Sequence, residues 1–220
     1  MRSILVLDMD GTLYAQNIYR KACKKAAENL KEYLKSKGRQ DAMTMELFER
    51  IAKHGKVSST VNMLHESSRL EKPGLLNAAY DLHPDDFGIG NDQRLVDYLN
   101  ALKGRFRLFV FTNSPLIWAG RVLRELGVDQ VVESSRWITF ESLDGGAHIK
   151  PSKEAFELML NKIGHRPGEI IFLDDSQECI ETAQGLGIDA RLICNDGHDH
   201  NVHSHSQSIY WELEQLIEGL

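Results

Sequence analysis

Short apolar runs alternate with segments of helical periodicity along most of this chain, and this alternation limits the possible folds more than any other feature. Each apolar run ends in polar residues, as buried strands commonly do. The apolar runs are residues 4–7, 108–111, 170–173 and 190–194, and the helical segments are residues 94–102, 116–126, 153–163 and 178–186. We expect two further short strands at residues 131–132 and 137–140. Strands that alternate with helices form a parallel sheet covered on both faces. The sequence therefore predicts an α/β fold with a doubly wound parallel sheet.

Residues 15–85 interrupt the alternation with helical patterns alone. Ile18, Ala22, Ala26 and Leu30 recur every fourth residue, which is the spacing of one face of a helix. Residues 72–91 hold two prolines and several glycines, which favours a linker that returns to the sheet. We therefore expect a small helical domain, residues 15–85, inserted after the first strand of a core domain made of residues 1–14 and 86–220.

The composition of the chain indicates its size class and the kinds of molecule that it is expected to bind. A chain of 220 residues with 42% hydrophobic content can build one core and a smaller insertion. The formal net charge of −6 does not favour nucleic acid polymers or anionic membranes, so a small molecule is the expected partner. Three widely spaced cysteines argue against a disulfide framework, and no apolar stretch has the length of a signal peptide or a membrane span. We expect a soluble, cytoplasmic protein of undetermined oligomeric state.

Polar side chains with a common chemistry follow three of the expected strands. The carboxyl ends of parallel strands open into one crevice, so residues at these positions should converge. The side chains in question are Asp8 and Asp10, Thr112, Asn113 and Ser114, and Asp174 and Asp175. Lys150 lies just before an expected helix, where Pro151 suits the first turn. The sequence thus predicts a pocket that combines four carboxylates with one lysine.

The charges of this pocket indicate what it binds. Two carboxylates about 4 Å apart repel by roughly 4 kcal/mol at an effective dielectric near 20, so cations or protons must accompany them. Lys150 supplies one positive charge, and a divalent metal would supply more. Oxygen donors without histidine or cysteine favour magnesium, which usually takes a substrate phosphate as a further ligand. Phosphoryl chemistry on a small phosphate ester is therefore the predicted activity.

These residues resemble the four ordered motifs of the haloacid dehalogenase superfamily, and specifically those of its magnesium-dependent phosphatases. Asp8-Met9-Asp10-Gly11-Thr12 resembles the first motif, Thr112 the second, Lys150 the third and Asp174-Asp175 the fourth. The resemblance covers residues 3–14 and 90–194. It implies a Rossmann-like core, with the helices of residues 15–85 as a cap that closes over the crevice and selects the leaving group.

The resemblance also implies a role for each residue. Asp8 would be the nucleophile that forms an aspartyl-phosphate, and Asp10 would act as the acid and then the base. Thr112, with Asn113 nearby, would bind phosphoryl oxygens, and Lys150 would neutralise negative charge. Mg²⁺ would be held by Asp8, the backbone carbonyl of Asp10, and Asp175, with Asp174 sharing the ion or orienting its waters.

The substrate prediction depends on a second resemblance, which is to the pyrimidine 5′-nucleotidase-like branch. The stretches that carry it are RLFVFTNSP, KPSKEAFELMLNKIG and IIFLDDSQECIETAQGLGI. It implies a hydrolase of nucleoside 5′-monophosphates or similar small phosphates. The candidate substrate contacts are Asn113 in the core and Asn17, Tyr19, His54 and Arg69 in the cap.

Alternatives share the same core residues. A sugar-phosphate phosphatase or a phosphomutase of the same superfamily would differ mainly in its cap contacts. A catalytically silent binding module would be expected to lack Asp8, Asp10 or Asp175, all of which are present. The run DGHDHNVHSH, with four histidines between His198 and His205, invites a zinc or nickel hypothesis. It has no strand-end scaffold, so we expect a solvated loop there.

Overall fold

A five-stranded parallel sheet forms the centre of the protein in the computed structural model, which describes residues 3–194 and 208–219 and leaves out the side chain of His54. The strand order is β3-β2-β1-β4-β5, so β1 lies in the middle. The strands are β1 (Ile4–Leu7), β2 (Arg107–Phe111), β3 (Trp137–Ile138), β4 (Ile170–Asp174) and β5 (Asp189–Leu192). All neighbours pair in parallel, which confirms the predicted doubly wound sheet.

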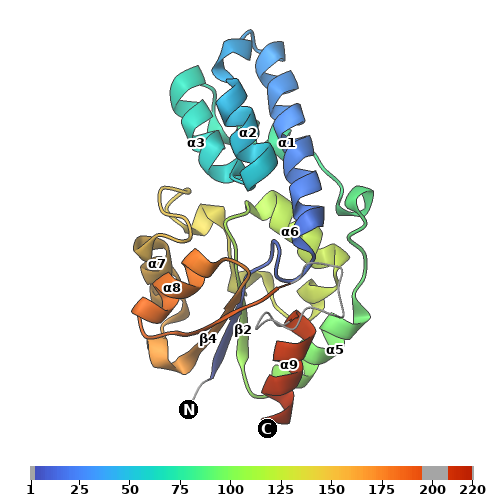
Figure 1. Cartoon of the computed structure of the whole chain (residues 1–220), viewed down its shortest axis with the longest axis vertical. Coiled ribbons are helices and arrows are strands. Elements are labelled where there is room, and N and C mark those ends of the chain that lie inside the picture. Colours follow the sequence, from blue (N-terminus) through green and yellow to red (C-terminus); the bar gives the residue numbers. More distant parts are fainter. Residues whose placement is uncertain (1–2, 195–207, 220) are drawn as a thin grey trace.

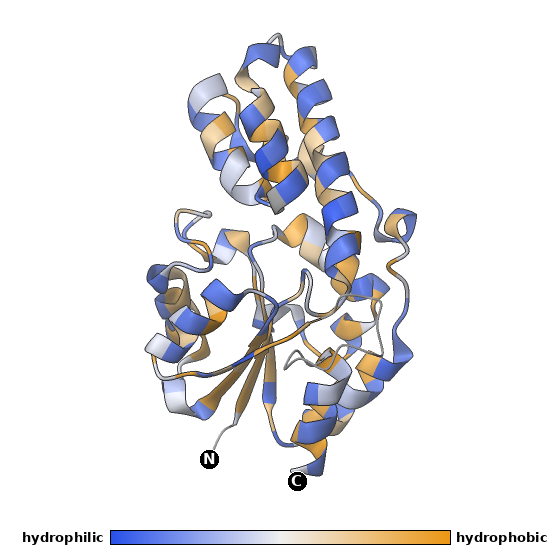
Figure 2. Ribbon diagram, viewed as in Figure 1, coloured by the Kyte–Doolittle hydropathy of each residue, from blue (hydrophilic) through white to orange (hydrophobic). Residues whose placement is uncertain are grey.

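Helices cover both faces of the sheet, as the alternation of apolar side chains along each strand requires. Leu5 and Leu7 of β1 belong to a hydrophobic cluster with α5, α6 and α9, whereas Ile4 and Val6 belong to a cluster with α7 and α8. These helices are α5 (Gln93–Leu102), α6 (Leu116–Glu125), α7 (Lys153–Ile163), α8 (Gln177–Gly185) and α9 (Ile209–Glu218). Figure 2 shows the resulting contrast between apolar strands and helices with one polar side.

Four further α-helices lie between β1 and α5, and they stand beyond the carboxyl ends of the strands (Figure 1). They are α1 (Gln16–Ser36), α2 (Met45–His54), α3 (Val57–Ser68) and α4 (Lys72–Ala79). The residues 15–85 that contain them are called the helical insertion below. Its polar contacts to the rest of the chain include the Ser58 hydroxyl, which donates to the Asn113 carbonyl at 2.9 Å. The two-domain division at residues 14 and 86 remains a prediction.

Two local predictions from the sequence were wrong. Residues 72–79 form α4 rather than linker, because Pro73 fits the first turn and Leu75, Leu76 and Ala79 bury against the other helices. Residues 131–132 are not a strand but follow the short 3₁₀ helix Val128–Gln130. The histidines between 198 and 205 lie outside the described residues.

No helix in residues 3–194 and 208–219 combines the length and the apolar character that crossing a bilayer requires. Of the three cysteines, Cys23 and Cys179 are buried and Cys194 is partly buried, and all three are free thiols. Burial raises the pKa of both buried thiols to about 12, so these two side chains pack as small hydrophobic groups.

Candidate active site

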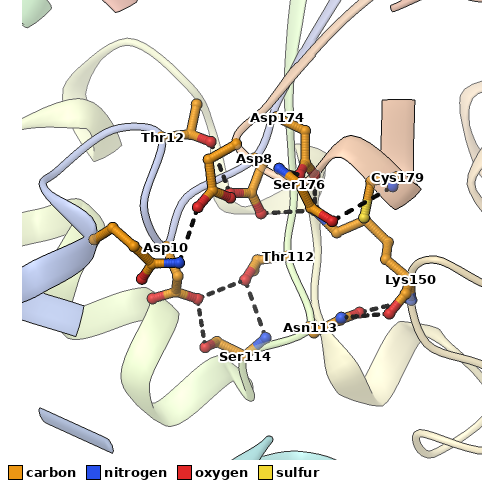
Figure 3. A network of polar contacts seen from close by, with 12 residues as sticks. Asp8, Asp10, Thr12, Thr112, Asn113, Ser114, Lys150, Asp174, Ser176 and Cys179 are labelled. Atoms are coloured by element: carbon orange, nitrogen blue, oxygen red, sulfur yellow. Dashed lines mark hydrogen bonds and ion pairs between the residues drawn. The ribbon is translucent and has the colours of Figure 1, made fainter. Parts of the chain in front are cut away.

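The register of the three central strands brings the predicted polar residues together. Leu7 of β1 pairs with Val110 of β2 on one side and with Leu173 of β4 on the other. Asp8 and Asp174 therefore leave the sheet at the same level, side by side (Figure 3). Thr112 follows β2 one residue beyond Phe111, so it reaches the same edge. These three residues line one cavity. The other predicted site residues of the core line it too, namely Asp10, Asn113, Lys150 and Asp175.

Lys150 links two of the carboxylates. Its ammonium donates to Asp8 Oδ1 and to Asp174 Oδ2, both at 2.6 Å, and its side chain is 3% exposed. The rings of Phe111 and Phe172 lie beneath it, with centroids 5.0 and 5.4 Å from Nζ. The aromatic faces and the carboxylates both favour a positive charge here, and Lys150 keeps a raised pKa despite its burial. Lys150 is therefore a fixed cation of this site.

Asn113 positions the lysine through its backbone. The Asn113 amide nitrogen donates to the Lys150 carbonyl at 2.9 Å, and the amide oxygen accepts from the Lys150 backbone N–H at the same distance. Both ends of the amide are occupied in this way. Asn113 lines the cavity, and its amide group holds the Lys150 backbone in place, while its contact with substrate stays a prediction.

Asp175 approaches the cluster over a glycine. Gly11 has a φ of +95°, and a Cβ added there would lie 2.2 Å from Asp175 Oδ2. Only glycine accommodates both the backbone conformation and the close carboxylate. Gln16, in the first turn of α1, donates its side-chain N–H to the same Oδ2 at 3.0 Å. This contact ties the first turn of the helical insertion to the carboxylates.

The pKa values show where positive charge is needed. Burial is the main cause that raises the pKa of Asp8 to about 6, with Lys150 lowering it and Asp174 raising it. Burial, together with the negative charges of Asp8 and Asp174, raises the pKa of Asp175 to about 8. A cation in contact with these groups would favour their ionised forms. The site is therefore short of positive charge even with Lys150 present.

The donors in this cluster fit a hard divalent cation. Asp8, Asp174 and Asp175 each offer one oxygen, and the three oxygens lie within 4.8 Å of one another. Oxygens on different sides of one magnesium ion, at about 2.1 Å from it, are separated by comparable distances. Beside them, Gln16 Oε1 is buried without a hydrogen-bond partner among the described residues, and a water of a hydrated ion would satisfy it. The residues thus fit the predicted magnesium cofactor.

Asp10 has a different environment from the other carboxylates. Its Oδ2 accepts from the Thr112 hydroxyl at 3.0 Å and the Ser114 hydroxyl at 2.6 Å, while its Oδ1 accepts from the Tyr14 hydroxyl and, at 3.2 Å, from the Trp118 indole N–H. Figure 3 shows the side chain of Asp10 turned toward Thr112 and Ser114. Burial and the charge of Asp8 nevertheless raise the pKa of Asp10. Four hydrogen bonds thus immobilise this carboxyl group, and its pKa lies above the ordinary value for an aspartate.

Comparison with known proteins identifies the family. The family model of haloacid dehalogenase-like hydrolases matches residues 3–187, which is most of the chain. The chain belongs to the haloacid dehalogenase-like hydrolases. The matched residues include all four sequence motifs, namely residues 8–12, Thr112, Lys150 and residues 174–175. These motifs supply the carboxylates and the lysine that converge in the cavity.

Solved structures of other proteins share the fold of this chain. A HAD phosphatase from Thermococcus onnurineus is 19% identical, with a TM-score of 0.60 over 100% of this chain and 99% of that one. CbbY from Rhodobacter sphaeroides, solved with phosphate, is 17% identical, with a TM-score of 0.57 over 94% and 93%. A HAD family enzyme from Bacteroides thetaiotaomicron, solved with magnesium and inorganic phosphate, is 18% identical, with a TM-score of 0.53 over 91% and 98%.

The helical insertion contributes several residues to the cavity of this family member. The cavity has a volume of about 950 Å³, and Tyr19 lines it as the sequence suggested. Asn17 and Arg69 are exposed and do not line it, so the cavity does not support their assignment as substrate contacts. The side chain of His54 lies outside the description, although its backbone ends α2.

Sequence reasoning missed several residues that the structure places at the site. Ser114 was among the predicted strand-end residues, but its hydrogen bond to Asp10 could be expected only once the loop after β2 was known. Trp118 is fully buried, and its indole N–H donates to Asp10. Gln16 and Arg50 come from the helical insertion, whose position over the sheet no local pattern revealed.

Proposed function

We propose that this protein is a magnesium-dependent phosphatase that hydrolyses small phosphomonoesters through an aspartyl-phosphate on Asp8. The observation that carries the proposal is the cluster of Asp8, Asp174, Asp175 and Lys150 at one end of a large cavity. Such a cluster is suited to a doubly charged phosphoryl group only when a metal offsets part of its negative charge. Family membership agrees with a hydrolase.

In the proposed reaction, a carboxylate oxygen of Asp8 attacks phosphorus, and the bond between phosphorus and the ester oxygen breaks. Asp10 gives its proton to the leaving oxygen, so the alcohol departs neutral. A water then attacks the aspartyl-phosphate, Asp10 takes a proton from it, and phosphate leaves with Asp8 restored. The raised pKa of Asp10 suits the first of these proton transfers.

The other residues serve this exchange by position and charge. Lys150 contacts Asp8 and would neutralise charge on the transferring group. Thr112 both lines the cavity and holds Asp10. Asp8, Asp174 and Asp175, with the backbone carbonyl of Asp10, would hold magnesium, which when bound polarises the phosphoryl oxygens. Residues 15–85 would form the cap domain, and residues 1–14 and 86–220 would form the core domain.

Nucleoside 5′-monophosphates are the substrates that the sequence resemblance suggests, and a substrate panel tests both this and the mechanism. Native protein and Asp8→Asn are assayed for phosphate release from uridine 5′-monophosphate, sugar phosphates and p-nitrophenyl phosphate, with magnesium or with a chelator. Asp41→Asn, an exposed carboxylate of the insertion, is the control. We expect magnesium-dependent release that Asp8→Asn abolishes and Asp41→Asn retains.

Two results would contradict parts of the proposal. Turnover by Asp8→Asn at the native rate would exclude Asp8 as the nucleophile. Turnover of sugar phosphates without release from any nucleotide would refute the nucleotide prediction and leave the mechanism standing. A strict requirement for a catalytic amount of bisphosphate, together with isomerisation in place of hydrolysis, would identify a phosphomutase instead.

A further inference from the structure

The cavity has two chemically different ends. The core supplies the carboxylates and Lys150, whereas the helical insertion supplies basic side chains to the lining. The basic residues in this lining are Arg20, Arg50, Lys53 and Lys56. We infer that the group released from the phosphate ester carries a negative charge of its own, a carboxylate or a second phosphate, and that Arg50 and its basic neighbours bind it. This inference rests on the proposed phosphatase activity, and it favours an anionic leaving group over the neutral nucleoside that the sequence resemblance suggests.

The geometry of α1 sets the distance between the two ends. Gln16 and Arg20 are one helical turn apart, so they share a face of α1. Gln16 is in contact with Asp175, which fixes this face toward the carboxylates. Arg20 lies about 6 Å further along the axis, because four residues rise that far in an α-helix. A phosphate ester bound at Asp8 therefore extends its leaving group toward Arg20.

The ends of α2 and α3 are held against α1. Gly55, at the end of α2, has a φ of +65°, and its carbonyl accepts from the Tyr19 hydroxyl at 2.9 Å. A Cβ at position 55 would lie 2.8 Å from the Tyr19 ring. This close contact places the last turn of α2, with Arg50, and Lys56 at the start of α3 around the same cavity. Arg20, Lys53 and Lys56 are exposed and Arg50 is half-buried, so Arg50 is the most buried of the four basic residues.

One nitrogen of the Arg50 guanidinium lacks a hydrogen-bond acceptor within residues 3–194 and 208–219. Its Nε is buried, yet it has no hydrogen-bond partner among the described residues. Lys53 differs, since it pairs with Glu49 at 3.0 Å on the exposed side of α2. A buried guanidinium N–H without an acceptor is costly, and a carboxylate or phosphate would satisfy it with charge-assisted bonds. A neutral sugar or nucleoside would offer weaker acceptors and no charge.

The test compares substrates that differ only in the charge of the leaving group. 3-Phosphoglycerate is compared with glycerol 3-phosphate, and glucose 1,6-bisphosphate with glucose 6-phosphate, in the native protein with magnesium. The first pair tests a carboxylate and the second a phosphate. We expect a higher kcat/KM for the anionic member of at least one pair. In Arg50→Met that preference should fall by about 10-fold to 100-fold, mainly through KM.

Control variants separate the charge of Arg50 from other effects. Lys31→Met removes an exposed charge of α1 that does not line the cavity, and it should leave the preference intact. Arg50→Lys should restore part of it. Equal kcat/KM within both pairs, or a preference that Arg50→Met does not change, would overturn the inference while phosphatase activity stands. If no substrate is hydrolysed with magnesium, both the inference and the proposed function fail.

Discussion

Replacing Lys150 by methionine removes the ammonium group and keeps a side chain of similar length. In the native site Nζ lies 2.6 Å from an oxygen of each of two buried carboxylates. Each contact contributes about 6 kcal/mol of Coulomb attraction at an effective dielectric near 20, most of which is offset by desolvation. Breaking a buried pair from one side typically costs about 3–5 kcal/mol. We expect Lys150→Met to lose that much free energy of unfolding.

Urea unfolding in the presence of a chelator measures this loss, and Lys153→Met is the control. Lys153 pairs with Glu157 at 3.1 Å, but both side chains are at least half exposed, so its removal should cost less than about 1 kcal/mol. The pKa of Asp8, about 6 in the native protein, rises further without Lys150. A carboxyl whose pKa is raised on folding destabilises the folded state as pH increases through that pKa. The loss of unfolding free energy in Lys150→Met should therefore be larger at pH 8 than at pH 5. Equal losses of unfolding free energy in Lys150→Met and Lys153→Met would refute the reasoning.

Two further substitutions probe the acid and the glycine beside the carboxylates. Asp10→Asn should lower turnover of glycerol 3-phosphate by roughly 10²-fold to 10⁴-fold and of p-nitrophenyl phosphate less, because both substrates need the base in the second step but only the poor leaving group also needs a proton in the first. Equal losses on both substrates in a steady-state assay would contradict the role of Asp10 as the acid. Gly11→Ala should lose roughly 1–3 kcal/mol of unfolding free energy and weaken magnesium binding, since its methyl group would displace Asp175. Gly88→Ala, with a φ of +80° and no atom near the new methyl group, should share the stability loss and keep magnesium affinity in calorimetry.

The sequence was sufficient for the sheet and for the residues at its carboxyl edge. A buried parallel strand needs a continuous apolar run, and the polar residue that ends the run marks the edge of the sheet, so Asp8 and Asp174 could be placed without coordinates. Their roles are implied by family resemblance. The helix 153–163 was also predicted to the residue, because Ser152 caps it and Gly164 ends it.

The contacts of the helical insertion could not be predicted in the same way. Amphipathic spacing shows that α1 buries one face, but not which polar residues of the opposite face meet the sheet. Gln16 and Arg20 therefore escaped notice, while Asn17 and Arg69, with suitable side chains, do not line the cavity. Their placement depends on tertiary contacts such as Tyr19 against Gly55, which join residues far apart in the sequence.

Calorimetric titration of the protein with magnesium tests the central claim most directly, namely that Asp8, Asp174 and Asp175 share one divalent cation. The native protein and Asp41→Asn should bind one ion with the same affinity, because Asp41 is exposed and remote from the cavity lining. Asp175→Asn should bind at least about tenfold more weakly. Native affinity in Asp175→Asn, or no binding to the native protein, would contradict the account.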